Sequence, residues 1–125
     1  MQMLSGKRIL VAEDEYLPAL ELQEMIENWG GTVIGPVSRL EQALSLVRSE
    51  ELDGAILDVM LNRDTSFPVA DELIAKGIPV IFVTGYDASL LPERFGSLPR
   101  LSKPYTEGES AGLLQRVFAK ADRAR

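Results

Sequence analysis

Residues 53–60 read Asp-Gly-Ala-Ile-Leu-Asp-Val-Met, and the fold that we expect is built outward from this stretch. The Asp-Gly pair is typical of a turn, and the apolar run that follows it is too short for a helix. The run therefore predicts a buried β-strand that stops at a lone acid, Asp58. In an open parallel sheet the carboxyl ends of the strands face the ligand crevice. Asp58 is thus the first candidate for a functional residue, although a single acid at a strand end more often begins a solvated loop.

The composition limits the classes of function. With 125 residues, we expect a single domain over residues 1–125, with its core at about residues 7–121 and no output domain. The formal net charge is −6, and the basic residues are scattered apart from a short cluster at the C-terminus, Arg116, Lys120, Arg123 and Arg125. Because a nucleic-acid site needs a coherent positive face, direct binding of DNA or RNA is disfavoured. The absence of histidine and cysteine removes the usual residues of zinc sites, disulfides and Ser-His-Asp catalysis. No stretch resembles a signal peptide or a membrane span, so we expect a cytoplasmic protein that does not bind membranes.

Short apolar runs alternate with amphipathic segments along the rest of the chain. The runs are short, partly β-branched and bounded by charge or turn residues, as in buried strands. We expect the strands at residues 7–12, 32–35, 55–58, 78–83 and 99–102. Apolar residues at helical spacing predict the helices between them. We expect the helices at residues 15–29, 38–47, 70–77, 87–96 and 106–121.

The local signals of these helices differ in strength. Two helices begin with a predicted capping box, in which a hydroxyl and a carboxylate three residues later each accept the other's backbone amide. The first pair is Ser38 with Glu41, and the second is Thr106 with Glu109. The segment 87–96 is the weakest element because it contains a proline and is flanked by glycines. We expect this segment to be short or mobile.

Strands that alternate with helices through short loops require a parallel sheet covered on both faces. We therefore expect an α/β fold of the flavodoxin-like type, with a doubly wound sheet of five strands and helices on two faces. The order 2-1-3-4-5 is the one most often built from such a chain, and it places the binding crevice between the ends of the first and third strands.

Polar residues end four of the predicted strands. Glu13 and Asp14 follow the first strand, Asp58 ends the third, Thr84 follows the fourth and Lys103 follows the fifth. Each of them alone is ordinary, as a cap, a turn residue or a solvated charge. Together they would place three carboxylates, a hydroxyl and an ammonium at one edge of the sheet. This set suits the transfer of a phosphoryl group onto a carboxylate.

Each residue type then has a chemical role. Clustered carboxylates bind Mg²⁺ through oxygen, and the metal neutralises charge on the transferring group. Asp58 would be the nucleophile and would end as an aspartyl phosphate. The ammonium of Lys103 would pair with one phosphoryl oxygen, and the hydroxyl of Thr84 would donate to another.

Four motifs carry a family resemblance. They are Val-Ala-Glu-Asp-Glu at 11–15, Leu-Asp-Val-Met-Leu at 57–61, Val-Thr-Gly at 83–85 and Ser-Lys-Pro at 102–104. In this order they resemble the response-regulator receiver domains of two-component signalling, over essentially the whole chain. Residues 82–86, Phe-Val-Thr-Gly-Tyr, further resemble the Phe-Ala-Thr-Gly-Tyr type of single-domain bacterial receiver.

The resemblance implies a phosphoacceptor at Asp58 and Mg²⁺ held by Asp14, Asp58 and the backbone carbonyl of Met60, with Glu13 acting through water. It also implies Thr84 as the switch hydroxyl, Lys103 as the phosphate-sensing cation, and a cis bond between Lys103 and Pro104. The protein would be a signalling phosphoacceptor that assists its own phosphoryl transfer, not an enzyme in the usual sense. A sensor histidine kinase or a histidine phosphotransfer protein would supply the phosphoryl group, and a downstream protein would receive the signal.

The sequence departs from the family pattern at one position. Many receivers carry an aromatic switch residue three positions before the lysine of the last strand, and Arg100 stands there in this chain. Tyr86 or Tyr105 could take its place. Alternatively, phosphorylation could reorganise the weak segment 85–96, as in switches that order or disorder a loop.

Three other functions compete with this interpretation. The same fold could dock a partner without phosphorylation, although the complete set of acids, hydroxyl and ammonium argues against it. A flavodoxin-like electron carrier is disfavoured because Glu-Asp-Glu at 13–15 would repel a flavin phosphate. A phosphatase of the haloacid dehalogenase type would want a second acid two residues after Asp58, where Met60 stands.

Overall fold

The computed structural model describes residues 3–119, without the side chains of Tyr86 and Asp87. Within these residues a five-stranded sheet forms the centre of the fold. Its strands are β1 (Arg8–Ala12), β2 (Thr32–Val37), β3 (Gly54–Asp58), β6 (Val80–Thr84) and β7 (Arg100–Ser102). The described α-helices are α1 (Tyr16–Asn28), α2 (Leu40–Ser49), α3 (Phe67–Ala75) and α4 (Glu107–Leu114).

The strands lie in the order β2-β1-β3-β6-β7, and every neighbouring pair is parallel. Counted within this sheet, the order is 2-1-3-4-5, which confirms the prediction. All five strands therefore end at the same edge. The register sets Ala12 of β1 beside Leu57 of β3, and Asp58 of β3 beside Val83 of β6.

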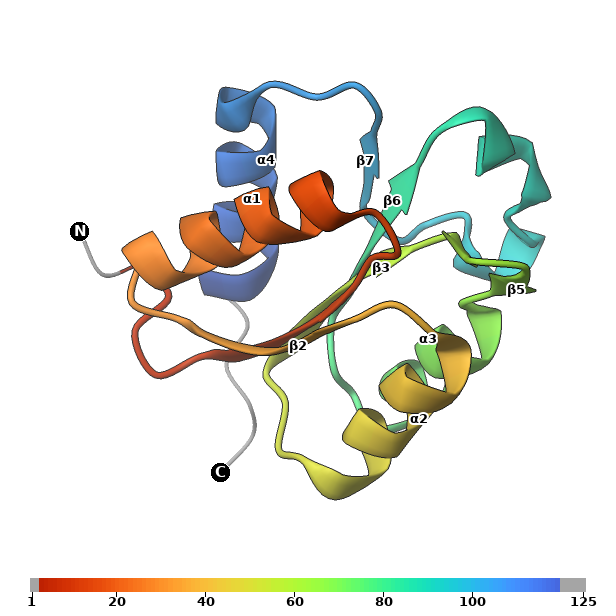
Figure 1. The fold of residues 1–125 in the computed structure, drawn as a ribbon, viewed down its shortest axis with the longest axis horizontal. Helices are drawn as coiled ribbons and strands as arrows, with labels where there is room; N and C mark the ends of the chain where they lie inside the picture. Colours follow the sequence, from red (N-terminus) through yellow and green to blue (C-terminus); the bar gives the residue numbers. More distant parts are fainter. Residues whose placement is uncertain (1–2, 120–125) are drawn as a thin grey trace.

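Two hydrophobic cores cover the two faces of the sheet. Alternate residues of one strand enter different cores, as in β6, where Val80 and Phe82 belong to one core while Ile81 and Val83 belong to the other. The helices α1 and α4 cover one face, and α2 and α3 cover the other (Figure 1). Burial on both faces explains why these strands are continuous apolar runs.

The predicted fourth helix at 87–96 is not an α-helix. The described residues contain four α-helices where five were expected, and this segment forms the 3₁₀ turns η1 (Tyr86–Leu90) and η2 (Glu93–Phe95). Pro92, in extended conformation, separates the two turns. The buried ring of Phe95 holds the second turn against the sheet, with its centroid 5.3 Å from that of Phe82. The guanidinium of Arg94 also donates to both carboxylate oxygens of Asp71 on α3, over 3.1 and 3.0 Å. The segment is thus short, as expected, but its second turn is anchored.

The capping box predicted for Ser38 and Glu41 is wrong. The helix α2 begins one residue later, with Arg39 at the N-cap position and no side-chain cap. The backbone amide of Ser38 instead donates to the side-chain oxygen of Gln42, over 3.3 Å. Only Ser38 and Arg39 separate β2 from α2. This short connection, and not the Ser38–Glu41 pattern, therefore decides where the helix begins.

The capping box of Thr106 and Glu109 is confirmed. The Glu109 amide donates to Thr106 Oγ1 over 3.0 Å, and the Thr106 amide donates to Glu109 Oε1 over 2.8 Å. The helix α4 continues as a π-helical turn, η3 (Gln115–Ala119), which carries the buried Phe118. Ala121, which we assigned to the same helix, lies outside the described residues.

Two local predictions around residues 53–66 need correction. Gly54, expected in a turn, is the first residue of β3. A Cβ at Gly54 would lie 2.5 Å from the ring of Phe118, so the residue is needed for close packing. No strand is expected between residues 59 and 69, but this stretch contains a small antiparallel hairpin of β4 (Met60–Leu61) and β5 (Asp64–Thr65).

Among residues 3–119, no helix combines the length and the apolar character that crossing a bilayer requires.

Candidate functional site

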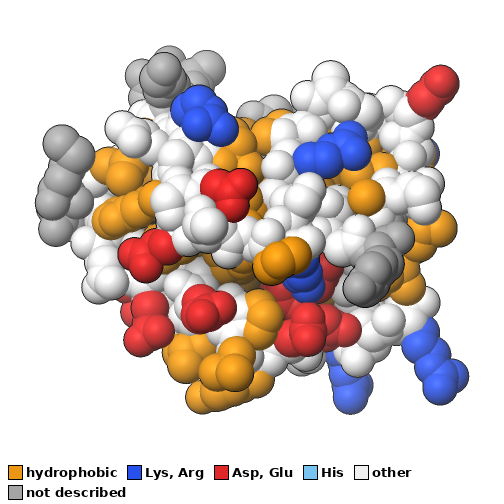
Figure 2. Space-filling model, turned by 90° about the horizontal axis from the view of Figure 1, so that it is seen from above, with side chains coloured by type: hydrophobic (Ala, Val, Ile, Leu, Met, Phe, Trp, Pro, Cys, Tyr) orange, Lys and Arg blue, Asp and Glu red, His pale blue; other side chains and the backbone are white. Residues whose placement is uncertain are grey.

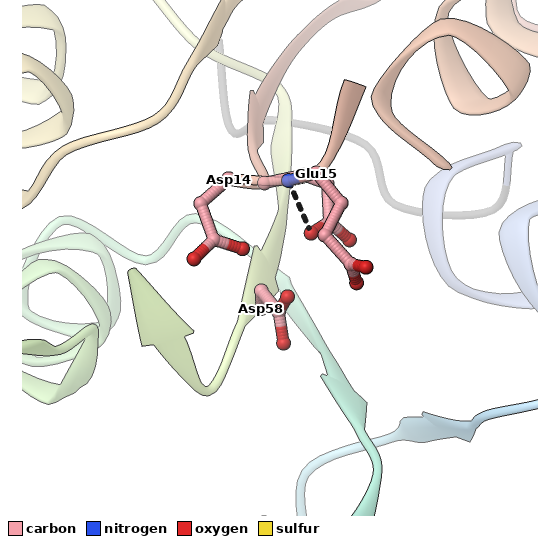
Figure 3. A group of neighbouring side chains, drawn as sticks. Asp14, Glu15 and Asp58 are labelled. Atoms are coloured by element: carbon pink, nitrogen blue, oxygen red, sulfur yellow. Dashed lines mark hydrogen bonds between the residues drawn. The ribbon is translucent and has the colours of Figure 1, made fainter. Parts of the chain in front are cut away.

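Four carboxylates meet at the carboxyl edge of the sheet. Glu13, Asp14 and Glu15 form the turn after β1, and Asp58 ends the neighbouring strand β3. One oxygen from each of the four lies within 4.8 Å of the others. Figure 3 shows the carboxyl groups of Asp14, Glu15 and Asp58 directed into the same space. The predicted trio is therefore brought together, and Glu15 joins it.

One ammonium of the described residues, that of Lys103, lies among these acids. Lys103 Nζ is 3.1 Å from Asp58 Oδ2, 3.2 Å from Glu15 Oε1 and 3.6 Å from Glu13 Oε1. Partial burial lowers the pKa of Lys103, but the hydrogen bond to Asp58 and the neighbouring charges outweigh it and raise that pKa above 10.5. The lysine is therefore a fixed positive charge, and the four acids are only partly neutralised.

Glu13 is the most confined of the acids. The whole residue is 3% exposed, and its Oε1 has no hydrogen-bond partner among the described residues. Burial first, and then the nearby carboxyl of Asp58, raise the pKa of Glu13 from 4.5 to about 8. The amide of Glu15 donates to Glu13 Oε2 over 3.2 Å and partly opposes that shift. A buried acid in this state is suited to a nearby cation or to a bound proton.

The hydroxyl of Thr84 lies at the end of β6, next to the strand that carries Asp58. Thr84 is 1% exposed, and its Oγ1 has no hydrogen-bond partner among the described residues. Its backbone carbonyl accepts the amide of Lys103 over 2.7 Å, which ties the ends of β6 and β7 together. A buried donor without a partner is costly, so a ligand at this edge would relieve it.

An open cleft of about 1010 Å³ gives access to Asp14, Glu15 and Asp58. Its wall includes Met60, on the hairpin strand β4, so the predicted contributor of a backbone carbonyl borders the same space as Asp58. The other lining residues are Asp14, Glu15, Pro18, Glu21, Gly85, Lys103, Pro104 and Tyr105. On the face drawn in Figure 2, acidic side chains gather around a basic one, with hydrophobic side chains beside them.

The peptide bond between Lys103 and Pro104 is cis, as the resemblance implied.

Arg100 is exposed on β7, and its guanidinium donates to the carbonyl of Gly96 over 3.3 Å. Of the two tyrosines considered as its replacement, Tyr105 is half-buried and lines the cleft. Burial, followed by the charge of Glu13, raises the pKa of Tyr105. The side chain of the other, Tyr86, lies outside what the structure describes.

Sequence reasoning missed three residues of this region. Glu15 was quoted in a motif but given no role. Ser66 is fully buried, and its hydroxyl donates to the backbone carbonyl of Asp58 over 2.6 Å. The amide of Asn62 donates to Asp14 Oδ2 over 2.9 Å. The last two contacts span 8 and 48 residues, and no short motif announces them.

Comparisons with known proteins agree with this fold. The transcriptional regulatory protein PdtaR of Mycobacterium tuberculosis is 31% identical over 104 residues, which are 80% of this chain and 51% of PdtaR. The phyllosphere-induced regulator PhyR of Methylorubrum extorquens is 34% identical over 120 residues, which are 88% of this chain and 43% of PhyR. The chain thus spans about half the length of the curated relatives that it matches. No protein-family model matches the sequence.

Solved structures extend the comparison. The solution structure of SdrG from Sphingomonas melonis Fr1 is 38% identical, with a TM-score of 0.78, over 91% of this chain and 96% of SdrG. The receiver domain of the response regulator TorR has a TM-score of 0.79 over 94% of this chain and all of the domain. At 20% identity, TorR shows a shared fold alone.

The chain belongs to the response-regulator receiver domains of two-component signalling. Receiver domains are signalling domains that control a response, so the acids, the hydroxyl and the ammonium lie in a fold used for signal transduction. The narrower assignment to the Phe-Ala-Thr-Gly-Tyr type stays a prediction.

Proposed function

We propose that Asp58 accepts a phosphoryl group from a phosphohistidine of a sensor histidine kinase or a histidine phosphotransfer protein. The observation that carries this proposal is the ammonium of Lys103, held 3.1 Å from the Asp58 carboxylate in a cleft open to solvent. A cation fixed beside a strand-ending carboxylate is placed to stabilise charge that arrives with a phosphoryl group.

The reaction is a displacement at phosphorus. An oxygen of the Asp58 carboxylate attacks the phosphorus, the bond from phosphorus to the donor's imidazole nitrogen breaks, and the imidazole leaves as a neutral ring after it takes up a proton. Lys103 pairs with one phosphoryl oxygen, and Thr84 donates its hydroxyl to another. The burial of Thr84 Oγ1 without a partner supports that role, because the phosphoryl group would satisfy it.

The acids fit a divalent cation. Asp14, Asp58 and the backbone carbonyl of Met60 would hold Mg²⁺, with Glu13 acting through water. These are hard oxygen ligands, which suit Mg²⁺. Bound there, Mg²⁺ would neutralise negative charge on the phosphoryl group. A receiver domain of the Pseudomonas aeruginosa sensor histidine kinase PA1611, 21% identical to this chain, was solved with a magnesium ion in its active-site cleft.

The signal would leave through a protein partner in the cytoplasm. A BeF3-activated conformation of SdrG, 38% identical to this chain, supports control by a group at the phosphoryl site. PhyR of Bartonella quintana, whose solved mutant structure is 24% identical to this chain, is an anti-anti-sigma factor, which supports a protein as the downstream target. A direct contact with nucleic acid or membrane is not part of the proposal.

Incubation with acetyl phosphate, with and without Mg²⁺, tests the proposal. Intact mass spectrometry should show one phosphoryl group on the wild-type chain with Mg²⁺, and none on Asp58→Asn. Asp64→Asn is the matched control, because it removes an exposed aspartate from the adjacent hairpin. Equal labelling of Asp58→Asn and the wild type would reject Asp58 as the acceptor. No labelling of the wild type by this donor or by a histidine phosphotransfer protein would favour the phosphorylation-independent interaction module.

A further inference from the structure

The turn between β4 and β5 contains an unusual residue. Asn62 has a φ of 60°, and it is the one non-glycine residue with positive φ among the described residues. The hairpin pairs Leu61 with Asp64, so Asn62 and Arg63 form a two-residue turn. Turns of this length favour a positive φ at their first position, and asparagine tolerates it. The turn therefore explains the backbone of Asn62 but not the contacts of its side chain.

Asn62 makes two hydrogen bonds outside its own hairpin. Its backbone amide donates to Asp14 Oδ2 over 2.9 Å. Its side-chain Nδ2 donates to the backbone carbonyl of Ser38, also over 2.9 Å. Asp14 lies in the turn after β1, and Ser38 lies between β2 and α2. One exposed residue thus joins three loops at the edge of the sheet where the acids meet.

The two bonds serve different ends. The bond from the amide to Asp14 is charge-assisted and occupies one carboxylate oxygen, which leaves the other oxygen of Asp14 available to a cation. The bond to Ser38 fixes the turn through an atom that only the side chain supplies. If the turn moved, the hydrogen bond from the Asn62 amide to Asp14 would weaken, because hydrogen bonds weaken steeply with misalignment.

We propose that Asn62 is a positioning residue that orients the Asp14 carboxylate for the divalent cation, with its side chain anchoring the turn on Ser38. This inference rests on the proposed function, since it takes Asp14 as a cation ligand. It adds to the proposed function a residue that orients a metal ligand and that no sequence motif indicated. Groups that orient ligands in this way commonly affect metal affinity by about tenfold or more.

The variant Asn62→Gly tests the side chain of Asn62 separately from the backbone of the turn. Glycine accepts positive φ and keeps the backbone amide, so the turn and the donor to Asp14 both remain, and only the bond to Ser38 is lost. We expect the dissociation constant for Mn²⁺, measured by electron paramagnetic resonance of the free ion, to rise about tenfold. In metal-free protein, the amide at position 62 should also exchange faster than in the wild type.

Arg63→Gly is the matched control, because it adds the same flexibility to the same turn and leaves Asn62 intact. It also removes a positive charge next to Asn62, which contacts Asp14, so any electrostatic effect on Mn²⁺ binding should be a gain in affinity. Thermal unfolding in EDTA shows whether the variants are folded.

Each outcome is decisive. An affinity of Asn62→Gly equal to that of the wild type would overturn the inference and leave the proposed function intact. A loss of affinity in Arg63→Gly as large as that in Asn62→Gly would also overturn it, because flexibility alone would then explain the effect. A wild-type chain that neither binds Mn²⁺ nor accepts a phosphoryl group would instead reject the proposed function.

Discussion

At the scale of the residue, the main feature of the site is the crowding of negative charge. Four carboxylates have oxygens within 4.8 Å of one another, while Lys103 is the one cation paired with them among the described residues. Repulsion among the acids raises the free energy of the folded state when no metal is present. A bound cation would relieve this repulsion. Two measurements on the metal-free protein test how much the repulsion destabilises the fold.

The substitution Asp58→Asn should raise the melting temperature in EDTA. It removes one of the crowded charges and keeps the shape of the side chain, so we expect a gain of about 1 kcal/mol, or a few degrees. Asp64→Asn, at an exposed position on β5, should change the melting temperature little. A fall in Asp58→Asn would mean that the ion pair with Lys103 outweighs the repulsion.

The raised pKa of Glu13 predicts how stability varies with pH. Its pKa in the folded chain is about 8, above its ordinary value of 4.5, so between these values the folded state holds more protons than the unfolded state. The free energy of unfolding in EDTA should therefore fall from pH 5 to pH 8, by up to about 1.4 kcal/mol per pH unit.

Urea denaturation at several pH values measures that slope. The variant Glu13→Gln should flatten it, because the neutral amide does not titrate, and saturating Mg²⁺ should flatten it in the wild type. A slope that is the same in Glu13→Gln would assign the effect to other groups.

At the scale of the element, the segment between β6 and β7 has weak helix signals in its sequence and no α-helix in the structure. Two 3₁₀ turns flank Pro92, and the buried Phe95 and the pair of Arg94 with Asp71 hold the second of them. Short 3₁₀ turns have poorer hydrogen-bond geometry than α-helices. Since Arg100 occupies the position of the usual aromatic switch, this segment is the candidate for the conformational change.

We expect phosphorylation to change the order of the segment 85–96. Amide hydrogen exchange there should differ clearly between the free protein and the protein with Mg²⁺ and beryllium fluoride as a phosphate mimic. The amides of α2 provide an internal control, because this helix is packed in the core through Ala43 and Val47. Equal protection of the segment in both states would end the hypothesis and leave Tyr105 as the described alternative.

Packing between β3 and η3 gives a further prediction at this scale. In Gly54→Ala, the new methyl group would lie 2.5 Å from the ring of Phe118, and such overpacking costs about 1–3 kcal/mol. Gly108→Ala on α4 is the control, since its nearest neighbour would be 3.9 Å away and alanine favours helices. Urea denaturation compares the two. A stable Gly54→Ala would show that Phe118 can move aside.

At the scale of the whole molecule, the sheet and most of the site could be predicted from sequence. Apolar runs of strand length and the polar residues that end them are local signals, and parallel order brings Glu13, Asp58, Thr84 and Lys103 to one edge. These predictions depended on position along strands, not on individual contacts.

The remaining features depend on contacts between distant parts of the chain. The hairpin after β3 has strands of two residues, too short for an alternating pattern. The need for Gly54 comes from Phe118, which is 64 positions away in the sequence. The bond from Asn62 to Asp14 spans 48 residues. Neither the secondary-structure propensity of single residues nor the periodicity of apolar residues predicts such contacts.

The central claim is that Asp58 carries the phosphoryl group, and locating the modified residue tests it most directly. Reduction of an aspartyl phosphate with borohydride leaves homoserine, which peptide mass spectrometry identifies in the sequence. After incubation with acetyl phosphate and Mg²⁺, we expect homoserine at position 58, and we expect none when EDTA replaces Mg²⁺. Homoserine at position 14 or 64 with position 58 unmodified would contradict it.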